Sequence, residues 1–234
     1  MMSATENNVS AGQMLFAIIY ILICPALVLF LSGDWHWLEG WIFAVWFIIF
    51  CFSSLIYLYQ RDPALLAERF KQPGTGNEKV WDQYFVYAFQ ILFWVWIIVM
   101  PLDAKRFGWS PEFPIWLKSL GGTALLPASF LLYRSFTDNT FLSPLVRIQT
   151  ERKQQVVSTG VYGFVRHPMY LGAILLFIGT PTLLGSQYGV LIGAVVSLLI
   201  VARTIGEEKM LVTELEGYAD YKTKVKYRLL PLVW

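Results

Sequence analysis

The sequence has few charged residues for its length. Asp, Glu, Lys and Arg make up 15% of its 234 residues, whereas soluble domains carry about 25%. Hydrophobic residues make up 56% of the chain, and many of them fall in uncharged runs long enough to cross a hydrocarbon core, which takes roughly 20 helical residues. The composition therefore indicates an integral membrane protein.

The chain also lacks the features of several other protein classes. The net charge is only +2, and no dense basic cluster is interleaved with aromatic residues, so a nucleic-acid partner has no electrostatic support. Cys24 and Cys51 lie in apolar runs without metal-ligand or redox spacing, which predicts buried, reduced thiols. No Walker, Rossmann or zinc motif is present, and we expect no metal site.

Two polar segments of the N-terminal half carry no sign of catalysis. Residues 1–10 contain no Lys or Arg, so they lack the cationic region of a secretory signal peptide, and the first apolar run is expected to be a permanent span. The connection 61–82 mixes charges of both signs and includes Pro73-Gly74-Thr75-Gly76, which is typical of a solvated connector. His36, between Trp35 and Trp37, is expected to have a structural role.

Uncharged runs predict an all-α fold. The first four apolar runs predict spanning helices at 11–33, 41–59, 83–102 and 113–133. The next run, 168–202, would extend about 52 Å as one helix, which is too long for a core of about 30 Å. It is therefore expected to fold back at Gly185-Ser186-Gln187. The prediction is a polytopic helical bundle of about six spans, the last two forming a short hairpin.

The positive charges are distributed unevenly between the two ends of this predicted bundle. Lys105, Arg106 and Lys118 fall at one end, and the other 15 of the 18 Lys and Arg residues fall at the opposite end. Because cytoplasmic loops retain positive charge, we expect both termini and the large C-terminal polar segments in the cytoplasm. The chain then divides into a four-span membrane region, 1–134, and a catalytic region, 135–234.

An amphipathic helix is expected after the last span. Leu211, Leu215, Tyr218 and Val225 recur at roughly helical spacing among charged residues. This cytoplasmic helix would lie on the membrane surface or cover a cytoplasmic site, and the sequence leaves both possibilities open.

Polar residues gather at the two ends of the predicted hairpin. One group precedes it and comprises Arg147, Gln149, Gln154, Gln155, Tyr162, Arg166, His167 and Tyr170, and the other follows it as Arg203, Glu207 and Glu208. Polar groups near hydrocarbon are costly unless they are paired or functional. Because a hairpin brings its two ends together, these groups meet at one membrane boundary and together favour a functional site.

Each of these residues taken alone has a simpler interpretation. Arg166 and His167 can simply mark the start of a helix at Pro168, since Pro is favoured at the first helical position. Arg203 and Glu207 can form a surface i, i+4 pair worth about 0.2 to 0.5 kcal/mol.

The C-terminal motifs resemble a known family. They are GVYGFVRHPMYLG at 160–172, RTIGEEKML at 203–211 and LEGYADYKTKVKYRLLP at 215–231. The sequence here resembles the integral membrane methyltransferases that include isoprenylcysteine carboxyl methyltransferase and phospholipid methyltransferases. The resemblance covers roughly 139–234, and the first four spans carry no comparable signature.

This resemblance implies S-adenosylmethionine (SAM) as methyl donor, with S-adenosylhomocysteine as product, held by C-terminal segments without a soluble Rossmann domain. Matched position by position, it implies these cofactor contacts: Gln149, Gln154, Gln155, Val156, Val157, Tyr162, His167, Pro168, Met169, Tyr170 and Glu207. Gln154 stands where the eukaryotic carboxyl methyltransferases have a His. Arg203 matches a residue placed near the substrate.

The residues suit the chemistry of methyl transfer. An in-line displacement needs alignment of donor and acceptor more than a covalent nucleophile. Glu207 would hold the donor's ammonium, and Arg203 would orient an anionic acceptor. An amine acceptor would need a base, for which Glu208 or His167 is the candidate. Arg203, Glu208 and Arg166 form the predicted catalytic set.

The acceptor is not specified by these motifs. A membrane-embedded carboxylate, amine or thiol fits a cytoplasmic site open to lipid. Two other functions remain as alternatives: an NADPH-dependent membrane sterol or enone reductase, and a non-catalytic membrane protein that keeps the hairpin for packing.

Overall fold

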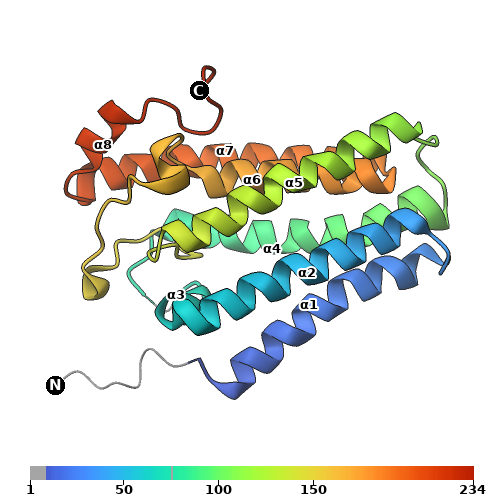
Figure 1. The fold of residues 1–234 in the computed structure, drawn as a ribbon, viewed down its shortest axis with the longest axis horizontal. Coiled ribbons are helices and arrows are strands. Elements are labelled where there is room, and N and C mark those ends of the chain that lie inside the picture. The colour runs from blue at the N-terminus through green and yellow to red at the C-terminus, as the bar shows by residue number, and fades with distance from the viewer. Residues whose placement is uncertain (1–8, 75) are drawn as a thin grey trace.

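A computed structural model describes residues 9–74 and 76–234 of the chain, and these residues contain helices and loops but no strand (Figure 1). The all-α prediction is confirmed. Residues 1–8, on which the signal-peptide argument largely rests, and Thr75 of the predicted connector lie outside the described residues. The long helices are α1 (Ala11–Ser32), α2 (Leu38–Arg61), α4 (Val80–Pro101), α5 (Ile115–Asp138), α6 (Pro168–Leu184) and α7 (Gln187–Glu214).

Shorter helices lie between and after these. The segments α3 (Pro63–Arg69) and α8 (Tyr218–Lys224) are α-helical, a π-helical turn η1 (Leu102–Arg106) extends α4, and two 3-10 turns follow as η2 (Thr150–Arg152) and η3 (Gly160–Gly163). In Figure 1, α3, α8 and the loops on either side of η2 gather at one end of the bundle. The opposite end holds the short α1–α2 and α6–α7 turns.

Among the described residues, five helices are long and apolar enough to cross a membrane: α1, α2, α4 with η1, α5 and α7. The remaining predicted span is α6, an apolar helix of 17 residues, which is about 26 Å long at 1.5 Å per residue. The expected fold-back between α6 and α7 is confirmed. Gly185 adopts the left-handed conformation (φ 81°) after α6, and the Ser186 side chain accepts a hydrogen bond from the Gly189 amide at the start of α7.

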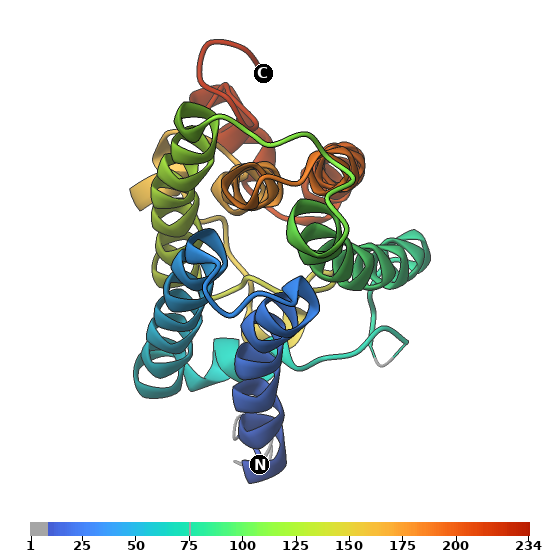
Figure 2. The ribbon, with the colours of Figure 1, turned by 90° about the vertical axis from the view of Figure 1, so that its right-hand side faces the viewer.

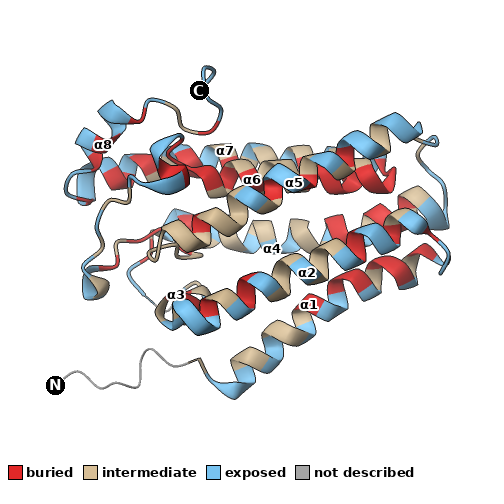
Figure 3. Cartoon of the chain, viewed as in Figure 1, coloured by how far each residue is buried: buried red, intermediate tan, exposed pale blue. Residues whose placement is uncertain are grey.

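The α6–α7 hairpin packs between α5 and α4, as the view along the helices shows (Figure 2). Glycines allow the close approach of these helices, because a Cβ at Gly121 would lie 2.4 Å from the Leu183 amide nitrogen, and one at Gly193 would lie 2.1 Å from the Phe177 carbonyl oxygen. Small residues serve this purpose widely in membrane helices. The buried residues accordingly lie on the helix faces that are turned toward one another (Figure 3).

The predicted C-terminal amphipathic helix is divided in two in the structure. The last span continues as α7 to Glu214, and the chain then turns at Gly217, which has a φ of 80°, before the seven residues of α8. Leu211, Leu215, Tyr218 and Val225 nevertheless belong to one buried cluster, which also includes Val146. The apolar face therefore covers other parts of the protein.

The connection 61–82 differs from the solvated connector that the sequence suggested. It contains the helix α3, and three of its carboxylates, those of Glu68, Glu78 and Asp82, are buried. A buried carboxylate is stable only when it is paired or hydrogen-bonded, and each of these accepts such bonds. This connection is therefore part of the packed structure.

Replacing Gly193 with Ala should destabilise the protein, because the added methyl group meets the Phe177 carbonyl of α6 and the two helices must separate. Overpacking of this kind typically costs about 1 to 3 kcal/mol. Thermal unfolding in detergent should show a lower midpoint for Gly193→Ala. The matched control is Gly12→Ala in α1, where the nearest atom to a new Cβ is the Ser10 Oγ at 3.9 Å. Equal midpoints for the two variants would contradict the packing described here.

Candidate functional site

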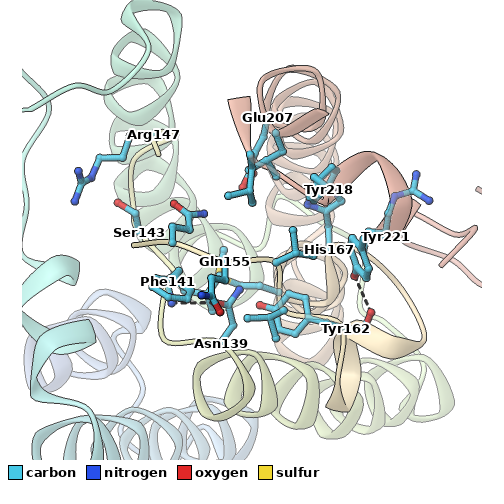
Figure 4. A pocket seen from close by; sticks show the side chains of 18 of the residues that line it. Asn139, Phe141, Ser143, Arg147, Gln155, Tyr162, His167, Glu207, Tyr218 and Tyr221 are labelled. Carbon is cyan, nitrogen blue, oxygen red and sulfur yellow. Dashed lines mark hydrogen bonds between the residues drawn. The ribbon is translucent and has the colours of Figure 1, made fainter. Parts of the chain in front are cut away.

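A pocket opens where α6 begins and α7 ends, and it encloses about 760 Å³ of empty space including its mouth (Figure 4). The walls come from the loop 139–157, η3, the first turn of α6, the last turns of α7, and α8. Elements distant in the sequence thus meet at the polar end of an apolar hairpin.

Ten of the fourteen predicted site residues line this pocket, namely Gln154, Gln155, Val156, Val157, Tyr162, Arg166, His167, Met169, Tyr170 and Glu207. The other four, Gln149, Pro168, Arg203 and Glu208, do not line it. The predicted juxtaposition of the two hairpin ends is present in the structure.

The first turn of α6 is held in place by the C-terminal tail. The Arg166 and His167 amides donate to the carbonyl oxygens of Tyr227 and Arg228, both at 2.9 Å. Pro168 then occupies the first position of the helix, where its missing N–H is not needed. The tail therefore fixes the backbone of the wall that carries His167.

Glu207 brings a carboxylate to the pocket from α7. Its Oε2 accepts a hydrogen bond from the Tyr170 hydroxyl of α6, and the Glu207 side chain is half-buried. Figure 4 shows it across the pocket from Asn139 and Tyr162. This carboxylate can interact with a cationic group bound in the pocket.

Aromatic rings form much of the remaining wall. The His167 and Tyr170 rings are stacked, with centroids 5.6 Å apart, and the Tyr218 hydroxyl lies 3.5 Å from His167 Nε2. The Tyr221 hydroxyl donates to the Tyr162 carbonyl oxygen at 2.7 Å. Such faces can stack on a planar base and can attract a cation.

One polar atom of this wall is buried without a hydrogen bond. The Tyr162 hydroxyl lies near Asn139 and Ser135 but makes no hydrogen bond of ordinary geometry with the described residues. Burial raises the pKa of this hydroxyl, so it remains protonated. Buried polar groups are rarely left unpaired, and this one can pair with a bound ligand.

Burial lowers the pKa of His167 below its usual value, against the smaller opposing effects of Glu207 and Glu208. Arg166 and Arg228 lower it further. The imidazole is therefore neutral at pH 7 and can accept a proton.

Glu208 lies behind the wall and is 2% exposed. Its Oε1 pairs with Arg166 Nε at 2.5 Å, and its Oε2 pairs with Arg228. Arg166 also donates to the carbonyl oxygens of Val225 and Lys226, at 2.6 and 2.7 Å. This geometry favours a structural role for Glu208 over the expected role as a base, because both of its oxygens hold the tail against the hairpin.

Gln149 is fully buried and organises the loop that carries the predicted cofactor contacts. Its Nε2 donates to the Phe141 carbonyl oxygen at 2.6 Å, and its Oε1 accepts from Arg152 at 2.8 Å. Its amide donates to Gln154 Oε1 at 2.8 Å. Gln149 therefore shapes the pocket indirectly.

Arg203 is also buried behind the wall. Its Nε and Nη2 donate to the two carboxylate oxygens of Asp82, at 2.8 and 3.0 Å, and Nη2 donates to the Pro144 carbonyl oxygen at 2.7 Å. The guanidinium carbon lies 4.6 Å from the Phe85 ring centroid and 5.8 Å from that of Tyr170. Arg203 thus contacts the pocket wall through Tyr170.

Several pocket residues were given no site role from the sequence, although Arg147 was placed in the polar group before the hairpin. The pocket is also lined by Asn139, Phe141, Leu142, Ser143, Leu145, Arg147, Leu211, Leu215, Tyr218 and Tyr221. Arg147 is held by Glu68 at 2.8 Å and Glu151 at 2.5 Å. Although burial raises the pKa of Glu68, its hydrogen bonds with Arg147, Lys71 and Ser143 lower it to about 2. Asp82, the partner of Arg203, was also missed from the sequence. Its position directly before the uncharged run 83–102 is the sign in the sequence that this acid is buried.

Parts of the chain are similar to known methyltransferases. Residues 119–216 match the family model described as Phospholipid methyltransferase. Protein-S-isoprenylcysteine O-methyltransferases B and A of Arabidopsis thaliana are 28% identical over 123 and 131 residues, which cover 52% and 55% of this chain. These alignments span 59% and 63% of the two relatives, so the match covers about three fifths of their length. The chain is thus similar to methyltransferases over about half of its length.

A solved structure titled as the eukaryotic intramembrane Ras methyltransferase ICMT (isoprenylcysteine carboxyl methyltransferase), without a monobody, superposes with a TM-score of 0.46. It is 18% identical, and the superposition covers 97% of this chain and 88% of that one.

The protein should lose stability as the pH falls below about 6.5, in part through His167. Its pKa is lower in the folded chain than in the unfolded chain, so the unfolded chain binds the proton first. This contribution is present above the unfolded pKa, near 6.5, and is lost as the pH falls toward the folded pKa. His167→Gln should flatten the decline of the unfolding midpoint between pH 7 and pH 5.

The matched control is His36→Gln, which changes the chain's other, exposed histidine. It should keep the pH dependence of the wild type. If His167→Gln retains the full wild-type decline, the buried neutral imidazole is not its source.

Proposed function

We propose that this protein is a SAM-dependent methyltransferase that acts on a lipophilic acceptor at the cytoplasmic face of a membrane. The observation that carries the proposal is the Glu207–Tyr170 pair, which places a carboxylate in an aromatic-walled pocket at the end of a membrane hairpin. The family matches support the same class of reaction.

The pocket residues fit the chemical groups of SAM. Its ammonium suits the carboxylate of Glu207, and its adenine suits the rings of Tyr162, Tyr218 and Tyr221. The unpaired Tyr162 hydroxyl offers a hydrogen bond to a polar group of the ligand. When bound, SAM supplies an electrophilic methyl group on a sulfonium.

The chain's own contribution is alignment and exclusion of water. The walls from α6, α7 and the loop 139–157 are braced by the tail and by buried ion pairs, so they are held in one geometry. Such fixed positioning can supply a large part of the rate enhancement of a bimolecular transfer. No residue needs to form a covalent bond.

The possible acceptors differ in whether they must lose a proton during methyl transfer. An ionised carboxylate attacks without losing a proton, whereas an amine must give one up. Glu208 is occupied by two arginines, which leaves His167, neutral and in the pocket, as the candidate base for an amine. We propose a lipophilic carboxylate as the leading acceptor, because its methylation needs no base. The names of the curated relatives specify an isoprenylcysteine acceptor and O-methylation for those proteins.

The location of the pocket supports entry of both reactants. The pocket lies at the end of the bundle where the predicted topology places 15 of the 18 Lys and Arg residues, and we propose that this end is cytoplasmic. A soluble donor would enter from the cytoplasm and an apolar acceptor from the bilayer. Residues 135–234 are proposed as the catalytic region because they supply the pocket lining, with 1–134 as the supporting membrane region.

Radiolabelled SAM should bind the detergent-solubilised protein, and Glu207→Gln should reduce its affinity by at least about tenfold, because a charge-assisted bond is worth about 1.5 to 3 kcal/mol. Glu214→Gln, an exposed acid later on the same helix, should leave binding unchanged. Binding of NADPH in place of SAM would favour a reductase and contradict the proposal.

Membranes containing the active protein and isotope-labelled SAM should accumulate a labelled lipophilic methyl ester. Mass spectrometry of extracted lipids measures this directly, and N-acetyl-S-farnesylcysteine serves as a defined carboxylate probe. Label in a phosphatidylethanolamine-type amine, with none in esters, would contradict the carboxylate proposal and assign the base role to His167.

A further inference from the structure

Asp82 joins the N-terminal membrane region to the candidate site. It lies in the first turn of α4, well before the family match begins at residue 119, and it is fully buried. Its Oδ1 accepts from Arg203 Nε at 2.8 Å, and its Oδ2 accepts from Arg203 Nη2 at 3.0 Å and from the Val146 amide at 2.6 Å. One carboxylate therefore binds both α7 and the loop that lines the pocket.

Arg203 is held in a single orientation by these contacts. The two parallel bonds to Asp82 match the fork of a guanidinium. The Pro144 carbonyl oxygen accepts a third bond, and the rings of Phe85 and Tyr170 confine the planar group. Nε and Nη2 of Arg203 donate these bonds, and Nη1 takes part in none of them. The Tyr170 hydroxyl in turn donates to Glu207, so the contacts run continuously from Asp82 to the pocket.

The packing of α4 against α7 is also close beside the site. A Cβ added to Gly206 would lie 2.8 Å from the Trp81 ring, and these two residues are the direct neighbours of Glu207 and Asp82. The helix that carries Asp82 is thereby held at a fixed distance from the helix that carries Arg203 and Glu207. A buried ion pair contributes little net stability but can specify one geometry.

We propose that Asp82 is a positioning residue for methyl transfer: it fixes Arg203, and with it residues 144–146, so that Nη1, the guanidinium nitrogen outside these bonds, meets an anionic acceptor head group next to the donor pocket. This inference rests on the proposed function. It assigns to the four-span region a direct part in the geometry of the site, through a residue that touches neither donor nor acceptor.

The experiment compares the full-length wild type with Asp82→Glu, which keeps the charge but moves the carboxylate by one methylene. We expect the KM for N-acetyl-S-farnesylcysteine to rise about tenfold or more, since small misplacement of a binding group has large kinetic effects. The Kd for SAM should stay within about twofold, because the Tyr170 hydroxyl donates directly to Glu207 and Arg203 contacts only the ring of Tyr170. An acceptor KM equal to that of the wild type in Asp82→Glu would overturn the proposal. A rise in the SAM Kd as large as the rise in the acceptor KM would also overturn it.

A second comparison remains informative if single variants fold poorly. The neutral pair Asp82→Asn/Arg203→Gln leaves no unpaired buried charge. If Asp82 acts through Arg203, this double variant should have the acceptor KM of Arg203→Gln alone, whereas independent effects would multiply and contradict the proposal.

The matched control is Glu214→Gln, which breaks the exposed ion pair between Lys79, at the start of α4, and Glu214 of α7. It should leave KM and Kd unchanged; a rise equal to that in Asp82→Glu would show that any contact between these helices matters equally. Failure of the wild type to bind SAM would refute the proposed function itself. Normal SAM binding and turnover with unaltered Asp82 variants would refute only this inference.

Discussion

The structure depends on the pairing of charged groups that are buried at the polar end of the membrane helix bundle. A charge at this depth is costly unless a partner neutralises it. Three arginines resolve this cost in the same way: Arg147 pairs with Glu68, Arg166 with Glu208, and Arg203 with Asp82. Each pair joins segments that are far apart in the sequence, and together they surround the pocket.

The ion pairs give different roles to two adjacent acids, Glu207 and Glu208, which the sequence alone does not distinguish. Glu208 is turned toward Arg166 and Arg228 and holds the tail in place. Glu207, one residue earlier, is turned toward Tyr170 and the pocket. Successive positions on a helix point about 100° apart, so one face of α7 braces the site while the next provides the carboxylate proposed to bind the donor.

Most of the fold was accessible from the sequence because hydrocarbon imposes a simple rule on composition. Uncharged runs located most helix ends to within about five residues, although α7 continues beyond the run 168–202 to Glu214, and the length of that run required a hairpin. The polar motifs then placed half of the pocket lining, since the two ends of a hairpin must be close together.

The partners of the charges were harder to predict. Nothing in the spacing of Asp82 and Arg203, 121 positions apart, indicates that they meet, and Glu68 looked like part of a solvated loop. The sequence alone makes Glu208 a candidate base, but the fold places an arginine on each of its two carboxylate oxygens. Long-range pairing depends on how helices pack, and the glycines that set this packing, such as Gly193 and Gly206, have no distinctive pattern.

The central claim is that the pocket between α6 and α7 binds the methyl donor. An experimental structure of the protein with S-adenosylhomocysteine tests it most directly. The account predicts the ligand's ammonium within hydrogen-bonding distance of Glu207 and its adenine among Tyr162, Tyr218 and Tyr221. A ligand bound elsewhere on the protein, with this pocket empty, would contradict it.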